Sequence, residues 1–306
     1  MPTQRERLCR GAALLRPTRQ RHVVAGLQTG AFDFEPPGFS PASEFVAAAL
    51  RRHLESSMRI LVTFAVEAEF APWRKLRRFQ ESRMADVDYF SAQISGAEID
   101  VLFTGIGGKS AWLETANAIY KSEIDVCISS GLAGGLRPEH QIGEILVAEK
   151  VLASPGDLVV LSEPSLVKSA VAMGAKRVPF FYTADRVVLR AAEKHDLGAF
   201  ADAVEMESCG VLLEASLFAA GIVAIRAISD TSDEDLPLDF NRVTGDSGDI
   251  SMKRILREVV SAPGSIPALI RFAQRSRLAA KSLANFLDRF LQAVVESHSA
   301  PVRPVQ

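Results

Sequence analysis

The chain has 306 residues, of which 48% are apolar and 24% charged, an ordinary composition for one large globular domain or two small ones. The net charge of −2 gives no overall field that would attract nucleic acid, so no nucleic-acid partner is expected. The three cysteines and five histidines show no paired spacing, which predicts neither disulfides nor a metal site. No apolar run reaches the ~20 residues of a membrane-spanning helix. We therefore expect a cytoplasmic protein without an integral membrane segment.

Residues 1–57 differ from the rest of the chain. They hold eight arginines, no lysine and five acidic residues, for a net charge of +3, whereas residues 58–306 carry −5. Three prolines between positions 36 and 41 break any regular element there. We expect a basic, disordered extension, or a start codon assigned upstream of Met58. Residues 58–306 then form the globular domain.

From Met58 onward, predicted strands and helices alternate. The strands, recognised by continuous or alternating apolar residues, are 59–64, 89–94, 99–103, 124–129, 143–152, 158–161, 178–182, 202–206 and 222–228. The helices are 110–121, 165–173, 207–220, 249–260, 266–275 and 278–295. Gly221 is expected to end the helix 207–220 in the left-handed conformation. This alternation predicts an α/β fold whose sheet is covered by helices on both faces.

The last predicted helix has one apolar face, because Leu283, Phe286, Leu287, Phe290 and Leu291 recur at three- and four-residue spacing. We expect this face to pack on the domain or on a second subunit. Attachment to a membrane surface is the less favoured alternative.

Two acidic residues follow the first strand. If the strand continued, Glu67 and Glu69 would point to opposite sides, and one of them would enter the crevice at the strand end. A carboxylate in a partly dry pocket can act as a general base on water. The alternative is that both are ordinary charges of a loop or a helix start.

Two glycine-rich segments follow later strands. Residues 104–109 contain Gly105, Ile106 and Gly107 before a predicted helix, and residues 129–136 contain Gly134. Glycines let backbone N–H groups approach a ligand closely, and a helix N-terminus favours anions. Neither segment is a Walker A loop, and tight turns alone would also explain both.

Two further strand ends carry carboxylates. Glu205, Met206 and Glu207 stand where one predicted strand runs into a helix, and Ser229 and Asp230 end another. Carboxylates beside apolar strands cost free energy unless they are solvated or paired. They are either site residues, or a helix-start charge and a turn acid.

In this order and spacing, the four features resemble the nucleoside phosphorylase/nucleosidase superfamily, and most closely its methylthioadenosine/S-adenosylhomocysteine nucleosidases. The matching segments lie between residues 58 and 240; they are AVEAEF (65–70), TGIGG (104–108), SSGLAGGL (129–136), VEMES (204–208) and RAISD (226–230). The resemblance implies a phosphorylase/hydrolase-like three-layer α/β/α sandwich with a central mixed β-sheet. It also implies cleavage of a purine nucleoside, a small-molecule substrate, without a cofactor.

The resemblance assigns a role to each acidic position. Glu69 resembles the acid that activates the attacking water, and Asp230, supported by Ser229, resembles the acid that engages the purine at N7. Met206 and Glu207 resemble the pair that contacts the ribose, with Glu207 holding the sugar hydroxyls. Further substrate-binding positions implied by the resemblance are Gly105, Ile106, Gly107, Gly134, Val187, Glu205 and Phe240.

The sequence departs from the family pattern in two places. The lysine that usually follows the GIG loop is displaced by one residue to Lys109, and Val187 stands where an aromatic residue often stacks on the base. Phe240 falls where the family has a phenylalanine near the 5′ substituent. The segment 233–243 and the tail segment 261–287 resemble a hopanoid-associated phosphorylase branch, which implies an adenosyl-hopane type of substrate.

We expect hydrolysis, with release of adenine from a 5′-substituted adenosine, rather than phosphorolysis. A phosphate nucleophile calls for arginines or dense N–H donors, and Glu69 on the nucleophile side would repel it. A phosphate-dependent purine nucleoside phosphorylase is the alternative, and a non-catalytic nucleoside-binding protein on the same fold is a further one. The resemblance also implies a homodimer.

Overall fold

The computed structural model describes residues 57–84, 87–107, 124–153, 158–218, 220–243 and 263–299. Its strands are β1 (Arg59–Phe64), β2 (Gln80–Met84), β3 (Val87–Ile94), β4 (Ala97–Phe103), β5 (Val126–Ser129), β6 (Leu132–Gly135), β7 (Ile145–Ala153), β8 (Val159–Leu161), β9 (Lys176–Thr183), β10 (Ala203–Glu205) and β11 (Gly221–Asp230). Its helices are α3 (Glu67–Leu76), α5 (Pro164–Ala172), α6 (Ala191–Gly198), α7 (Ser208–Leu217), α8 (Phe240–Val243), the 3₁₀ turn η1 (Pro263–Ser265) and α10 (Ile266–Ser299).

All these strands form one mixed sheet, in the order β2-β3-β4-β1-β5-β11-β6-β10-β9-β7-β8. The centre is parallel, because β1 pairs with β4 and β5 in that sense and β11 pairs likewise with β5 and β6. β11 also pairs antiparallel with β7. The strands β11, β6, β10, β9 and β7 therefore close into a ring at one side of the sheet.

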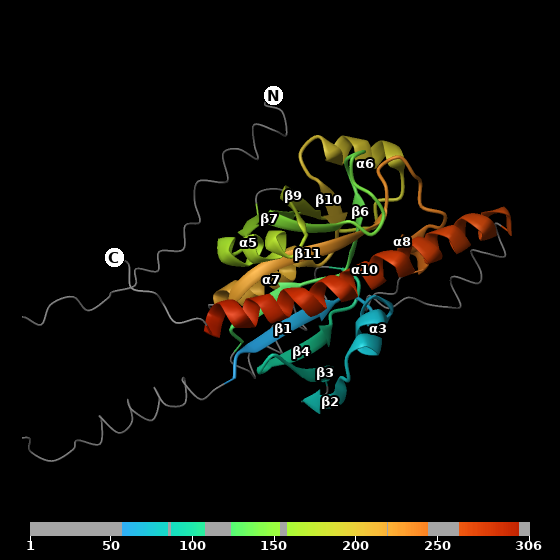
Figure 1. Ribbon diagram of the computed structural model, residues 1–306. Coiled ribbons are helices and arrows are strands. Elements are labelled where there is room, and N and C mark those ends of the chain that lie inside the picture. The colour runs from blue at the N-terminus through green and yellow to red at the C-terminus, as the bar shows by residue number, and fades with distance from the viewer. Residues whose placement is uncertain are drawn as a thin grey trace, which may run out of the picture.

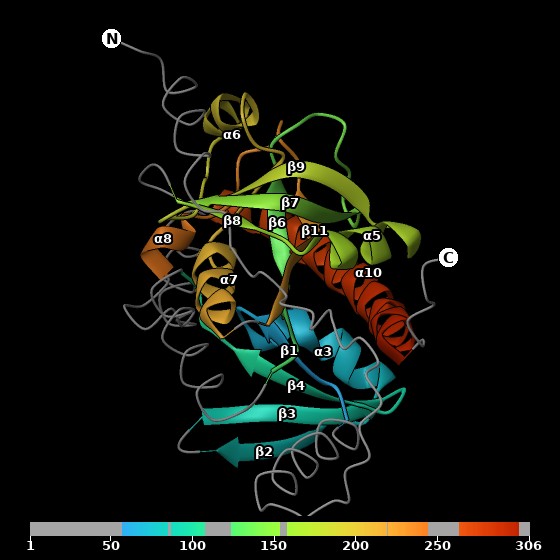
Figure 2. The same cartoon turned by 90° about the vertical axis from the view of Figure 1, so that its left-hand side faces the viewer.

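Helices cover both faces of the sheet, as predicted. Figure 2 shows α7 on one side and α3, α5 and α10 on the other, and α10 runs in nearly the same direction as β1 (Figure 1). The core divides accordingly into one cluster that includes α3, α5 and α10 and another that includes α7. The three-layer α/β/α sandwich with a central mixed sheet is confirmed.

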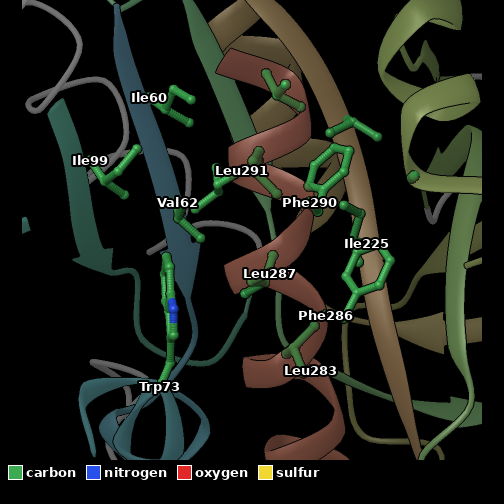
Figure 3. Packing of buried hydrophobic residues seen from close by; sticks show 14 of the residues in the cluster. Ile60, Val62, Trp73, Ile99, Ile225, Leu283, Phe286, Leu287, Phe290 and Leu291 are labelled. Carbon is green, nitrogen blue, oxygen red and sulfur yellow. The ribbon is translucent and has the colours of Figure 1, made fainter. Parts of the chain in front are cut away.

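The long helix α10 fills the larger part of this core. Phe286 and Phe290 point toward β11 (Figure 3) and, like Leu287, are at most 2% exposed. Trp73 of α3 and Asp288 of α10 lie close enough for the indole Nε1 to donate to Oδ1 over 3.4 Å. The apolar face predicted for the last helix therefore packs on the domain itself.

Several predicted elements are confirmed with small shifts of their ends. β1 matches the predicted 59–64, and the predicted hairpin turns at Ser95 (φ 52°) and Gly96 (φ 88°). Such left-handed pairs match the twist of two-residue hairpins. The predicted helices 110–121 and 249–260 and the extension 1–56 lie outside the described residues.

Other predictions about elements are wrong. The helices 266–275 and 278–295 are one helix of 34 residues, α10. Pro267 does not interrupt it, because this proline stands in the first turn, where no backbone N–H is needed. Gly221 does not cap α7 but opens β11, where its N–H donates to Asp125 O. Two points that the sequence left open are decided by the structure: Glu67 starts helix α3, and the glycine-rich residues Leu132–Gly135 form strand β6.

Candidate active site

A pocket opens at the end of β1 and β11, beside β6 and β10. Ala65 and Val66 after β1, Leu132 of β6 and Asp230 at the end of β11 line it. Ten of the twelve predicted site residues are in its wall: Glu69, Ile106, Gly134, Val187, Glu205, Met206, Glu207, Ser229, Asp230 and Phe240. Gly105 and Gly107 flank Ile106 in the chain. The fold therefore brings together residues that are up to 171 positions apart.

Glu69 enters the pocket because α3 starts two residues earlier. Its Oε2 accepts the N–H of Ala65 and its Oε1 that of Leu132, both over 3.0 Å. Burial raises the pKa of Glu69, although these hydrogen bonds oppose the shift. Glu67 instead pairs with Arg74 at 3.0 Å on the exposed side of α3. Of the two acids after β1, only Glu69 faces the site.

Position 131, in the loop between β5 and β6, requires a glycine. A Cβ there would stand 3.1 Å from Oε2 of Glu69, and the φ of +145° is one that other residues rarely adopt. The close approach of this backbone to Glu69 fixes the carboxylate against the start of β6.

Glu205 is fully engaged inside the protein. Its Oε2 accepts the N–H groups of Glu207 (3.1 Å) and Ser208 (2.7 Å) and the guanidinium of Arg226, and its Oε1 accepts the hydroxyl of Thr183. A carboxylate offers about four acceptor sites. Glu205 therefore holds the turn from β10 into α7 and has little capacity left for a substrate.

Glu207 lies in the pocket wall at that turn. The N–H of Gly107 donates to its Oε1 over 3.0 Å, from a backbone with φ 107°. Burial, followed by the nearby charge of Glu205, raises the pKa of Glu207 to about 8. Glu207 therefore holds a proton near neutral pH. We call Glu69, Glu205 and Glu207 the three-glutamate end of the pocket; Arg226 is the buried cation beside them.

Asp230 also lies in the pocket wall, where β11 ends. Ser229 Oγ donates to its Oδ1 over 2.8 Å, and Lys194 Nζ donates to its Oδ2 over 2.5 Å. A Cβ on Gly134 would stand 3.0 Å from the same Oδ2, so glycine at this place leaves room for the carboxylate. We call Asp230 and Lys194 the aspartate end of the pocket. Lys194 was not among the predicted site residues, and neither was Arg226.

Aromatic and aliphatic side chains complete the wall. Phe240 and Phe272 have ring centroids 5.3 Å apart, and Leu236 and Val187 line the same pocket. Asn241 holds the backbone of Val187 through both its side-chain oxygen (2.8 Å) and nitrogen (3.0 Å). Phe272 comes from α10 and was not predicted. This part of the wall offers apolar contact to a ligand.

The described residues offer neither a metal site nor a membrane-spanning helix. No group of three or more His, Cys, Asp or Glu there could hold a metal ion. None of the helices in those ranges is long and apolar enough to span a bilayer. Lys109, which follows the GIG loop, lies outside the described residues.

A mixed sheet between helix layers, with an acid-lined pocket at the strand ends, defines an α/β protein with a site for a small polar molecule. The family model of the Phosphorylase superfamily matches residues 59–261. The chain belongs to that superfamily.

Individual relatives are more distant. The chain is 26% identical to a 5′-methylthioadenosine/S-adenosylhomocysteine nucleosidase of Anoxybacillus flavithermus, over 60% of this chain and 90% of the relative. It is 24% identical to an aminodeoxyfutalosine nucleosidase of Campylobacter jejuni, over 65% and 97%. A crystal structure of the Helicobacter pylori 5′-methylthioadenosine/S-adenosylhomocysteine nucleosidase has a TM-score of 0.61 at 21% identity, covering 78% of this chain and 99% of that one. This last likeness supports the fold.

Proposed function

We propose that the protein hydrolyses the N-glycosidic bond of a 5′-substituted adenosine and releases adenine. The observation that carries this proposal is the single pocket with Glu69 and Glu207 at one end and Asp230 at the other. The names of the relatives, which are nucleosidases, support the same reaction.

The chemistry needs acids in these positions. Breaking the bond leaves positive charge on the ribose and electron density on the purine. In the proposed arrangement, Glu69 takes a proton from the attacking water, and Glu207 holds the ribose hydroxyls and orients the sugar. Purine N7 takes a proton from solvent and Asp230 accepts the resulting N–H, which makes the base a better leaving group. Adenine leaves neutral, and Glu69 returns the proton that it took from water to solvent.

Hydrolysis is favoured over phosphorolysis by the environment of Glu69. Its oxygens accept hydrogen bonds from the N–H groups of Ala65 and Leu132. These two N–H groups are therefore not available as donors to a phosphate. Arg226 is buried against Glu205, and Arg186 pairs with Glu193. The cations that the described residues bring to the pocket are therefore already engaged.

The apolar wall favours an apolar 5′ substituent. Phe240 and Phe272 would contact a methylthio group or the thioether of S-adenosylhomocysteine. An adenosyl-hopane type of substrate is the finer alternative, supported by the resemblance of the C-terminal tail to the hopanoid-associated branch. We further propose that the protein is cytoplasmic and forms a homodimer. Light scattering of the purified protein tests the homodimer.

One assay separates these possibilities. The protein is incubated with methylthioadenosine, S-adenosylhomocysteine and an adenosyl-hopane, with and without phosphate, and adenine is measured. We expect adenine without phosphate. Strict dependence on phosphate with a ribose-1-phosphate product would establish the phosphorylase instead. Nucleoside binding without turnover would support a non-catalytic protein.

A further inference from the structure

Lys194 is a fully buried lysine whose three N–H groups all have partners. The residue is 0% exposed, and its Nζ lies 2.5 Å from Asp230 Oδ2, 2.9 Å from Thr231 O and 3.0 Å from Glu234 O. An ammonium has three donors and no acceptor, so this geometry satisfies the charged form completely. Burying an ammonium costs several kcal/mol unless it is paired in this way.

The same lysine ties the segment after β11 to α6. Two of its bonds go to backbone carbonyls of that segment, which continues to Leu236 in the pocket wall. The side chain of Arg190, at the start of α6, binds the same segment from the exposed side through Asp235 at 3.0 Å. Among the residues that the structure describes, Lys194 alone connects the segment to the carboxylate of Asp230.

The contacts of Asp230 suit its ionised form. The ammonium of Lys194 donates to one oxygen and the hydroxyl of Ser229 to the other, and an ionised carboxylate only accepts hydrogen bonds. We propose that Lys194 is a positioning and specificity-determining residue, which holds Asp230 as an acceptor and so favours a 6-aminopurine over a 6-oxopurine. This proposal rests on the proposed function, which places the base against Asp230.

The chemistry of the two bases explains the preference. A 6-aminopurine presents N–H donors to the carboxylate, from the amino group and from N7 once it is protonated. The O6 of a 6-oxopurine would place its lone pairs against the negative charge, which leaves buried acceptors without donors. Without the ammonium, burial favours the neutral acid, which can donate a hydrogen bond to O6. Removal of Lys194 should therefore reduce the preference for a 6-aminopurine over a 6-oxopurine.

The test compares two matched ligand pairs on the full-length protein and its Lys194→Met variant. The first pair is 5′-methylthioadenosine and 5′-methylthioinosine, compared by kcat and KM; the second is adenine and hypoxanthine, compared by calorimetric Kd. We expect the preference for the amino member to fall at least tenfold, with a rise in KM for the adenosine. An unchanged preference in a folded variant overturns the proposal. Should Lys194→Met fail to fold, Lys194→Gln, which keeps an N–H donor without the charge, takes its place.

Two controls separate this role from a structural one. Arg190→Met removes a cation that holds the same segment but does not touch Asp230, and we expect it to leave the preference unchanged. On an Asp230→Asn background, Lys194→Met should cause no further loss of preference, because the lysine acts through that carboxylate. An equal loss from Arg190→Met, or an additive loss in the double variant, overturns the proposal.

The binding measurements also keep the two proposals apart. If no nucleoside is cleaved, the proposed function fails, while the adenine–hypoxanthine comparison still tests Lys194. If the wild-type protein binds hypoxanthine as tightly as adenine, the inference about Lys194 fails even where adenine is released.

Discussion

At the three-glutamate end of the pocket three carboxylates share one buried cation, Arg226, whereas at the aspartate end one carboxylate meets one ammonium. Burial, and after it the nearby charge of Glu205, raises the pKa of Glu207 to about 8. At the aspartate end, Lys194 and the hydroxyl of Ser229 satisfy the carboxylate. One pocket thus holds a carboxyl group with a raised pKa, Glu207, and a carboxylate paired with an ammonium, Asp230.

This difference has a general physical basis. Buried carboxylates that outnumber their cations take up protons, while a carboxylate with a matched cation keeps its charge. In the reaction proposed for this protein, Glu207 meets the sugar hydroxyls and Asp230 meets the departing purine, so the two carboxyl groups need different environments. Changing single members of either end should therefore have distinct effects.

The largest effect is expected from Glu69→Gln. The amide cannot take a proton from water, so turnover should fall by a factor of about 10²–10⁴, measured as adenine release. The matched control is Glu67→Gln, which changes an exposed acid two residues away and should leave turnover within about twofold of wild type. Equal losses in both variants would contradict the role of Glu69.

Removal of the shared cation should chiefly affect stability. Arg226→Met leaves Glu205 buried without its cation, and breaking such a pair costs about 3–5 kcal/mol of unfolding free energy, measured by urea unfolding. Arg177→Met, which breaks the exposed pair with Glu149, should cost under about 1 kcal/mol. Similar costs for both variants would show that Arg226 does not hold this end together.

The proton on Glu207 predicts a pH dependence. Because its pKa is raised from 4.5 to about 8 in the folded protein, its protonation stabilises the fold fully below pH 4.5, and this contribution is lost as pH rises through 8. Relative to Glu207→Gln, the wild type should therefore lose up to about 1.4 kcal/mol per pH unit across that window. Urea unfolding at several pH values measures this. Parallel curves for the two proteins would rule out the bound proton.

The smallest effect is expected from Gly134→Ala. The new Cβ would lie 3.0 Å from Asp230 Oδ2 and 3.3 Å from Val204 Cγ1, so the carboxylate has to shift by a few tenths of an ångström. We expect kcat/KM to fall about tenfold, since catalytic geometry tolerates little displacement. Gly264→Ala, where nothing lies within 4 Å, should change nothing. Wild-type kinetics in Gly134→Ala would show that the aspartate end of the pocket tolerates this displacement of the carboxylate.

Buried strands were the most predictable part of the fold. β1 contains the apolar run Ile60–Val62 and β11 the apolar run Ile222–Ile225, and a short continuous apolar run between loop signals has few other interpretations. β6, with the sequence LAGG, was interpreted as a tight turn or a ligand-binding segment, because its strand conformation depends on pairing with β10 and β11. Such pairing joins residues that no local pattern connects.

Helix ends were less predictable. The prediction divided α10 at residues 276 and 277, where the helix is continuous and Ser276 Oγ donates to Phe272 O, one turn earlier. Gly221 followed the predicted helix at the usual capping position, but the need to pair with β5 placed it in a strand.

The acidic site positions could be proposed because each stands at the end of an apolar strand, where a charge is unexpected. Lys194 gave no such signal: it lies in the sequence Glu-Lys-His-Asp, which is typical of an exposed helix face. Its acceptors follow 36 to 40 residues later. Sequence patterns identify a lone carboxylate more readily than the partner that neutralises it.

The position of α10 also has a consequence for how the chain folds. This helix follows every strand in chain order, yet it packs on the sheet face formed by β1 and β11 and supplies Phe272 to the pocket. During synthesis, the part of that face that α10 covers therefore stays exposed until α10 leaves the ribosome, and exposed apolar sheet surface is prone to aggregation. The pocket is likewise completed only when α10 packs on the sheet.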